Sequence, residues 1–269
     1  MDFTKEKAIR IIVNQTIKSF ASGFEARHEA EVDDPEGSIN MKKNNCFINV
    51  LGNEFIFYSA FVRSFDSSFG TVLESLGNAI AKFSYETNHT IYSYMLPEQT
   101  QHISSILDKY EDHNSEPSIE HYENFYVLQP SDTTSFKTHH ECDNWFYDRN
   151  TDTHYLLELK AGGDLDNKKA KSEKIALLKE YFMLKNSLGK NAKIKIRFAT
   201  AYNKFGEGNA WHQPNVERMF AREELLIGKD YWNFVCNDPD GFDIIFDEYK
   251  KASKYIKRSL AKIKKIYNV

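Results

Sequence analysis

The sequence predicts a mixed α/β (α+β) fold, in which a β-sheet core is flanked by helices. Apolar residues recur at spacings of three and four over residues 4–29 and again over 240–267, as in amphipathic helices. Short apolar runs bounded by turn residues cluster between residues 125 and 200, which is typical of strands. The resulting order of elements predicts a mixed sheet with a helical N-terminal layer and a long C-terminal helix.

The length of 269 residues is that of one large domain or of a core with an elaborated second lobe, and we predict a single domain. We expect three parts within it: a mainly helical part over residues 1–122, a core that carries the chemistry over 123–235, and a basic helix over 236–269. Hydrophobic residues make up 41% of the chain, which is enough to bury a core of this size.

The composition is that expected of a cytoplasmic protein. No window holds 18 uncharged apolar residues, and the charged start of the chain lacks the apolar stretch of a signal peptide. The cysteines, Cys46, Cys142 and Cys236, are far apart and match neither a zinc pattern nor a disulfide framework. A reducing compartment is therefore expected.

The N-terminal part is expected to consist of helices. The first covers residues 4–29, and Thr4 is its expected N-terminal cap. Residues 54–85 are expected to be helical in two pieces, separated around residues 66–70, where polar residues and a glycine gather. A short helix is expected near Ser104–Tyr110.

The core is expected to alternate strands and helices. Four strands are expected, at Phe125–Leu128, Asn144–Tyr147, His154–Leu159 and Lys193–Thr200. The second and third are joined by a hairpin-like turn over residues 148–152. A helix over residues 167–186, capped by Asp166, separates the third strand from the fourth, and Pro214 suits the first turn of a further short helix.

The net charge of −4 hides an asymmetry along the chain. Residues 167–269 carry 22 Lys and Arg against 12 Asp and Glu, whereas residues 1–166 carry 13 against 27. The basic residues are densest over 167–197 and after Glu248. Solvated helix faces would explain these runs, and so would a surface that binds the phosphates of a nucleic acid.

The strongest functional signal is a pair of expected strands that each bring a carboxylate to one end of the sheet. Glu158-Leu159-Lys160 ends an apolar run, and Gly162-Gly163 follows it. Because side chains alternate along a strand, those of Glu158 and Lys160 point to the same face. Asp143 lies on the preceding strand, so its carboxylate can meet that of Glu158.

Such a site suits one hard divalent cation and one activated water molecule. Mg²⁺ prefers oxygen ligands and keeps several waters, so the carboxylates of Asp143 and Glu158 would suffice. The ion would offset the charge that develops during phosphodiester hydrolysis and lower the pKa of its bound water. Lys160 would orient or deprotonate that water and stabilise the transition state. A surface hairpin with an ordinary Glu–Lys pair is the alternative interpretation.

Other side chains are weaker candidates. Glu141 could replace or assist Asp143, and Glu74 could bring a further carboxylate from a helix, although an isolated helical Glu more often lies on the surface. His139 and His140 have no Cys or His partner at a suitable spacing, so turn residues are expected rather than zinc ligands. The chain has no P-loop and no Gly-x-Ser-x-Gly, which argues against nucleotide-driven and serine-hydrolase chemistry.

Side chains that could contact DNA follow the central elements. The polar loop after the fourth strand carries amide, lysine and histidine side chains that suit base edges, and the flanking helices carry cations that suit phosphates. A solvent loop around a packed Trp211 is the alternative interpretation. The candidates for DNA binding are Lys168, Lys169, Asn203, Lys204, Asn209, His212, Gln213 and Arg218.

These motifs resemble those of the PD-(D/E)xK nucleases and, more narrowly, those of type II restriction endonucleases of the TdeIII-type branch. The resemblance spans residues 140–250 and rests on Asp143, the segment Glu158–Lys174 and the blocks Ala199–Asn209 and Gly228–Val235, with a weaker echo from Phe69 to Glu74. Cys142 stands where the nominal motif has Pro.

The resemblance implies a restriction-endonuclease-like core in which Asp143 and Glu158 bind Mg²⁺, Lys160 is the catalytic lysine and Glu74 is a further acid at the site. It implies cleavage of double-stranded DNA at a short palindromic sequence, GGNCC or a related one, to leave 5′-phosphates. A palindromic site implies a homodimer, for which the terminal amphipathic helices are the expected surfaces. A DNA methyltransferase would be the functional partner of such an enzyme.

Three alternatives stay open on the sequence alone. A structure-specific nuclease of repair or recombination could use the same core without cutting at a fixed sequence. A DNA-binding protein without catalysis could keep the acidic cluster as a structural feature. A nuclease directed at RNA would prefer a substrate that contains ribose.

Overall fold

The computed structural model describes residues 1–127 and 138–269, which form two compact units. Unit 1 comprises residues 1–80 and 240–269, and unit 2 comprises residues 81–239. These boundaries differ from the expected ones at 122 and 235, because the first strand of the sheet already begins at Glu86. That the whole chain is a single domain stays a prediction.

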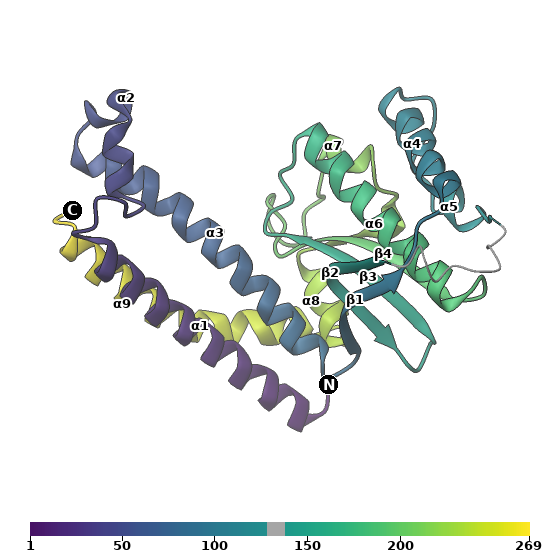
Figure 1. The fold of residues 1–269 in the computed structure, drawn as a ribbon. Coiled ribbons are helices and arrows are strands. Elements are labelled where there is room, and N and C mark those ends of the chain that lie inside the picture. The colour runs from purple at the N-terminus through teal and green to yellow at the C-terminus, as the bar shows by residue number, and fades with distance from the viewer. Residues whose placement is uncertain (128–137) are drawn as a thin grey trace. The chain divides into compact units, whose positions relative to one another are not determined.

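Unit 1 is built from long helices. They are α1 (Phe3–Glu31), α3 (Asn53–Ala81) and α9 (Gly241–Ile266). Helices α1 and α9 lie side by side and run in the same direction (Figure 1). Asn14 donates a hydrogen bond of 2.9 Å to Glu248 near their N-terminal halves, and Lys262 pairs with Glu25 at 2.7 Å near their ends. Their apolar stripes are thus largely buried within unit 1, and the expected dimer surface on these helices stays a prediction.

Helix α3 completes unit 1 through an aromatic cluster. Phe24 of α1 packs edge-on against Phe61 and Phe65 of α3 at 5.5 and 5.6 Å between ring centroids. Phe57 contacts Tyr267 beyond the end of α9. Offset and edge-to-face ring pairs stabilise such a cluster beyond the area they bury. Aromatic packing therefore joins α3 to α1 within unit 1.

The structure corrects details of the expected N-terminal helices. Helix α3 is continuous through residues 66–70, where Phe65 and Phe69 stack on each other and both contact Phe20 of α1. The cap of α1 is Asp2 rather than Thr4: its carboxylate accepts from the backbone N–H groups of Thr4 and Lys5. Two short helices, η1 (Asn40–Asn44) and α2 (Cys46–Asn49), lie between α1 and α3.

Unit 2 contains a five-stranded mixed sheet in the order β1-β2-β3-β4-β5. Strands β1, β2 and β3 pair antiparallel, whereas β3, β4 and β5 pair parallel. Strand β3 is therefore the centre of the sheet, with an antiparallel neighbour on one side and a parallel one on the other. The strands are β1 (Glu86–Ser93), β2 (Thr138–Asp148), β3 (Thr153–Lys160), β4 (Lys193–Thr200) and β5 (Leu225–Ile227).

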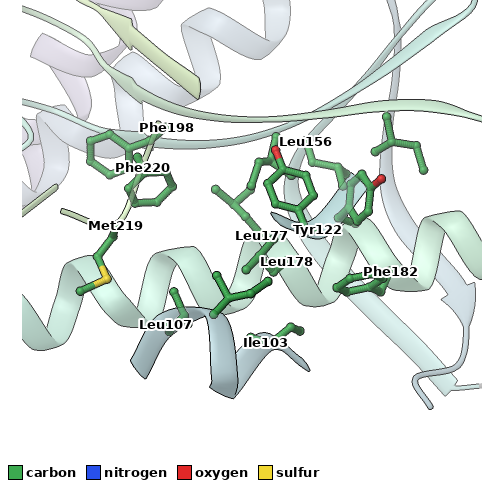
Figure 2. Close-up of a cluster of buried hydrophobic side chains, with 14 of the residues drawn as sticks. Ile103, Leu107, Tyr122, Leu156, Leu177, Leu178, Phe182, Phe198, Met219 and Phe220 are labelled. Carbon is green, nitrogen blue, oxygen red and sulfur yellow. The ribbon is translucent and has the colours of Figure 1, made fainter. Parts of the chain in front are cut away.

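Helices cover both faces of the sheet. Figure 2 shows Leu156 and Phe198 of the sheet on one side of α6 (Asn167–Leu188), while Ile103 of α4 (Pro97–Glu111) lies on its other side. On the opposite face, α8 (Lys229–Cys236) packs through Phe234 against Tyr155 and Tyr85. Strand β3 thus lies between two layers of helices.

Several expected core elements are confirmed, and others were missed. The second to fourth strands, the β2–β3 hairpin and helix α6 with its cap Asp166 are present. Residues Phe125–Val127 do not form the expected strand, and Leu128 lies outside the described residues. Strands β1 and β5 and helix α8 were not expected, because polar β1 lacks a clear apolar pattern and β5 is only three residues long. The expected helix at Pro214 is present as α7 (Pro214–Glu217). Another short helix of unit 2 is α5 (Glu120–Glu123).

The structure also bears on the expectations about membrane spans and disulfides. Over residues 1–127 and 138–269, no helix combines the length and the apolar character needed to cross a bilayer. Cys46, Cys142 and Cys236 are all free thiols.

A buried ion pair fixes the position of α6 in unit 2. Lys174 and Glu224 have exposed fractions of 1% and 0%, and the ammonium nitrogen lies 2.5 and 2.7 Å from the two carboxylate oxygens. The hydroxyl of Tyr122 donates to the same carboxylate at 2.9 Å, and the backbone N–H of Ala221 donates at 2.7 Å. Because the Glu224 carboxylate accepts from Lys174, Tyr122 and Ala221, the pair is tolerated in the interior, and it constrains the rotation of α6 about its axis.

Removal of one partner should destabilise unit 2 strongly. We expect Lys174→Ala to lower the free energy of unfolding by about 3–5 kcal/mol, because it leaves Glu224 buried without a countercharge. Urea denaturation followed by circular dichroism measures this change. Lys179→Ala, an exposed position on the same helix, should change stability by no more than about 0.5 kcal/mol. Equal effects of the two variants would contradict the role given to the buried pair.

Candidate active site

Glu158 and Lys160 lie on one face at the C-terminal end of β3, as the alternation of strand side chains predicts. Glu158 is buried, with 9% of its surface exposed, and Lys160 is partly buried. The ammonium nitrogen of Lys160 lies 2.6 Å from the Oε1 atom of Glu158. Both side chains point to the side of the sheet covered by α6, because Lys160 also contacts a residue of that helix.

The two glycines after β3 bring the chain close to the loop that follows β4. Gly163 has a φ of +68°, which a residue with a side chain rarely adopts. A Cβ atom on Gly162 would lie 2.5 Å from the hydroxyl oxygen of Tyr202. The backbone N–H of Ala201 donates to the carbonyl of Lys160 at 3.1 Å. The glycines are therefore required for close packing at the end of β3.

Asp143 lies in a β-bulge of β2. Asn88 of β1 pairs with Trp145, but Thr90 pairs with Glu141. An advance of two residues along β1 therefore corresponds to four residues along β2. His89, between the two β1 positions, forms a hydrogen bond of 3.2 Å with the carbonyl oxygen of Asp143. A bulge redirects side chains and is frequent next to active sites. Simple alternation, which would put Glu141 and Asp143 on one face, does not hold through this segment.

The bulge leaves Asp143 next to Glu158. Asn144, which follows Asp143, pairs with Leu157, which precedes Glu158. The negative charge of Asp143 contributes to the raised pKa of Glu158, as a nearby carboxylate does. The structure thus brings together the three residues Asp143, Glu158 and Lys160 that the sequence predicted for one site.

Helix α6 adds two acids that sequence reasoning missed. The Oε1 atom of Glu173 lies 2.9 Å from the ammonium nitrogen of Lys160. Glu180 is buried, and its Oε1 atom lies 3.4 Å from the Nε2 atom of His140. The two acids are seven residues apart, which places them on one face of the helix. The sequence did contain a signal for them: Glu173 and Glu180 are the two acids among the basic residues of 167–197, and their spacing puts both on one face of the helix.

His139 and His140 are strand residues rather than the turn residues that the sequence suggested. Both lie in β2, and they pair with Tyr92 and Ile91 of β1. The expectation failed because β1 was not recognised, so nothing indicated a partner strand for this segment. His140 faces α6 and contacts Glu180, whereas His139 is exposed.

The electrostatics of the site show an excess of negative charge. Burial raises the pKa of Glu158 to about 7 against the opposing interaction with Lys160, and the charges of Glu173 and Asp143 add to the rise. Burial, together with the charges of Glu158 and Asp143, raises the pKa of Glu180 to about 8. Burial lowers the pKa of Lys160, but its contacts with Glu158 and Glu173 outweigh burial, so the net shift is upward. One ammonium group therefore faces several carboxylates.

The donor set suits a hard divalent cation with few protein ligands. Over the described ranges 1–127 and 138–269, no cluster of three or more His, Cys, Asp or Glu side chains is arranged as a complete metal cage. The adjacent carboxylates of Asp143 and Glu158 offer oxygen donors, and their mutual repulsion would be relieved by a cation. The site therefore fits an ion that keeps several of its water ligands, and it does not fit a closed zinc site.

Most amide candidates for DNA contact are used inside the loop after β4. The side-chain amide of Asn203 donates to the carbonyl of Asn209 at 2.8 Å, and Asn209 donates to the carbonyl of Phe205. Gln213, which is buried, donates to Asp164 at 2.6 Å. These three side chains fold the loop into a defined shape, so base contacts are better suited to its exposed residues.

The charged candidates lie on the surface around the loop. Lys204 pairs with Asp164 at 3.2 Å. His212, with 72% of its side chain exposed, contacts Glu217 at 2.7 Å. The remaining candidates flank α6 and α7: Lys168 and Lys169 are exposed at the start of α6, and Arg218 donates to Asn167 at 3.3 Å.

Glu74 lies on α3 in unit 1, whereas Asp143, Glu158 and Lys160 lie in unit 2. Its expected place at the site stays a prediction.

The raised pKa values predict that metal-free protein loses stability as pH rises. Glu158 and Glu180 bind their protons more tightly in the folded protein than in the unfolded chain. Between pH 4.5 and about 8 the folded state therefore holds more protons, and each such group lowers the free energy of unfolding by up to about 1.4 kcal/mol per pH unit. Urea denaturation in EDTA at several pH values measures the slope. Glu180→Gln should flatten it, and an unchanged slope in this variant would contradict the assignment.

Comparison with known proteins agrees with this geometry. A family model described as type II restriction endonuclease, HinfI, matches residues 5–253. Searches of curated proteins and of solved structures found no match. The family match covers nearly the whole chain and includes every residue of the candidate site. The chain therefore belongs to the HinfI family of type II restriction endonucleases, which are hydrolases that cleave DNA at specific sites.

Proposed function

We propose that this protein is a Mg²⁺-dependent endonuclease that cleaves both strands of DNA at a short palindromic sequence and leaves 5′-phosphates. The observation that carries the proposal is the convergence of Asp143, Glu158 and Lys160 at the end of β3, in a chain that belongs to a restriction endonuclease family. The resemblance to the TdeIII-type branch predicts GGNCC or a related sequence as the site.

Asp143 and Glu158 are the residues that would hold the metal. When bound, Mg²⁺ would supply Lewis acidity and lower the pKa of a water molecule. Lys160 would contribute a positive charge beside the phosphate. Because its contacts with Glu158 and Glu173 raise its pKa, Lys160 is better suited to stabilise the charge of the transition state than to act as a base.

The assembly follows from the symmetry of the substrate. A palindromic site presents the same sequence to each strand, so a two-fold homodimer would place one active site on each. We propose this state together with a methyltransferase that protects the same sequence in the cell. The family match favours this reading over a repair nuclease, because the matched family is defined by restriction enzymes.

Substitution in the active site should separate binding from cleavage. We expect Glu158→Ala and Lys160→Ala to abolish cleavage of phage-length DNA in Mg²⁺ while DNA binding in Ca²⁺ persists, because each removes a group that acts on the reacting phosphate. Gel analysis after incubation with Mg²⁺ or with EDTA gives the readout, and exposed Glu223→Gln is the matched control.

Discrete bands with wild type and Mg²⁺ alone would support the proposal, and the fragment ends would then reveal the sequence and the stagger. A smear would instead indicate a nuclease without a fixed site. Undiminished cleavage by Glu158→Ala or Lys160→Ala would contradict the catalytic role proposed for that residue.

Helix α9 provides a surface for the DNA backbone. Some of its lysines pair with acids, as Lys262 does with Glu25. Lys254, Lys257 and Arg258 are exposed on the face opposite the buried Ile256. Clustered cations without neighbouring acids bind phosphates by releasing counterions, regardless of sequence. We propose that this stripe contacts phosphates of the substrate.

Neutralisation of the stripe should weaken binding uniformly. Replacing Lys254, Lys257 and Arg258 by Gln should reduce the slope of log affinity against log salt by about 0.9 for each phosphate that the protein no longer neutralises. Fluorescence anisotropy in Ca²⁺ with cognate and unrelated duplexes measures this, and both should weaken equally. Lys262→Gln is the control on the same helix. An unchanged slope in the triple variant would show that α9 is only a solvated face.

A further inference from the structure

Lys160 is held between two carboxylates that belong to different elements. Glu158 lies on the same strand, with its Oε1 atom 2.6 Å from the ammonium nitrogen, and Glu173 reaches across from α6 to 2.9 Å. If Glu158 binds a metal ion, as the proposed function requires, its charge is shared between that ion and Lys160. Glu173 is then the partner that can hold Lys160 in place.

We propose that Glu173 is a positioning residue, which holds the Lys160 ammonium group over the reacting phosphate. This inference rests on the proposed function. A lysine side chain has four flexible bonds, and its catalytic use requires a defined position within a fraction of an ångström. A salt bridge from a second element supplies that constraint without occupying a metal ligand.

The surroundings of Glu173 suit this role. Its side chain is 21% exposed and that of Lys160 is 33% exposed, so water screens the pair less than it screens surface pairs. The next residue, Lys174, is locked into the buried ion pair with Glu224. Because that pair fixes the rotation of α6, it also fixes the direction in which Glu173 extends.

A purely structural role is the alternative. In that case the pair would only fasten α6 to β3, and its loss would lower stability without a specific effect on the chemical step. A metal-binding role for Glu173 is a second alternative. The two alternatives and the proposal differ in measurable ways.

The first experiment measures single-turnover cleavage of a short duplex with saturating enzyme, alongside DNA affinity in Ca²⁺. Glu173→Ala should slow cleavage by about 10- to 100-fold, as loss of an outer partner does at metal sites, and should leave affinity and thermal unfolding unchanged. Glu173→Gln keeps an acceptor oxygen and should recover part of the rate. Exposed Glu223→Gln is the matched control and should cleave as wild type does.

The second experiment measures Mn²⁺ binding by electron paramagnetic resonance, without DNA. Glu173→Ala should bind Mn²⁺ as wild type does, whereas Glu158→Ala should lose affinity. Weaker binding by Glu173→Ala would overturn the proposal in favour of a ligand. Lower thermal stability with an unchanged cleavage rate would overturn it in favour of a structural role.

A third measurement tests whether Glu173 acts through Lys160. Lys160→Gln, which keeps a side chain of similar length without the charge, is the background for this test: in overnight digests at high enzyme concentration, adding Glu173→Ala to Lys160→Gln should not lower its residual cleavage further. A further loss would contradict the proposal. If wild type cleaves and Glu173→Ala cleaves equally well, this inference fails while the proposed function stands; if wild type does not cleave, the proposed function itself fails.

Discussion

The buried ion pair between Lys174 and Glu224 is the constraint on which the active site depends. Neither charge is accessible to water, so each tolerates burial only while the other is in place. Two hydrogen bonds from the ammonium group of Lys174 tie α6 to Glu224, which Tyr122 of α5 also contacts, so the pair constrains the rotation of α6. Since Glu173 precedes Lys174 in the chain, the rotation that satisfies the core also directs Glu173 toward Lys160. An interaction of the core thus determines the geometry of a partly exposed site.

Topology explains why acids from separate elements converge. Helix α6 connects the parallel strands β3 and β4, so it must return across the sheet and begin near the end of β3. Its first turns therefore lie beside Lys160, and Glu173 and Glu180 follow on one face. The antiparallel hairpin brings Asp143 to the same end of the sheet. The order of elements therefore brings these segments to one end of the sheet, while the bulge in β2 and the rotation of α6 decide which side chains meet there.

The part of the site that could be predicted from sequence is the part that depends on local periodicity. Glu158 and Lys160 share a face because strand side chains alternate, and a short turn between two apolar runs indicates a hairpin. The position of Asp143 depends on a bulge against β1, a strand distant in sequence with few apolar residues. The contact of Glu173 with Lys160 depends on how α6 packs, which no local pattern contains. Periodicity identifies the faces of elements, while register and rotation come from distant contacts.

The site keeps charges that do not favour the folded state by themselves. Burial and mutual repulsion raise the pKa values of Glu158 and Glu180, which means that ionising either one costs stability. A core selected for stability alone would place an apolar residue at position 180 of α6, where Glu180 is buried against His140 of β2. Strongly shifted carboxylates concentrate at functional sites because their function requires charge in a poorly solvated place. The same repulsion gives a divalent cation its driving force: by neutralising these acids it would recover stability that the metal-free fold lacks.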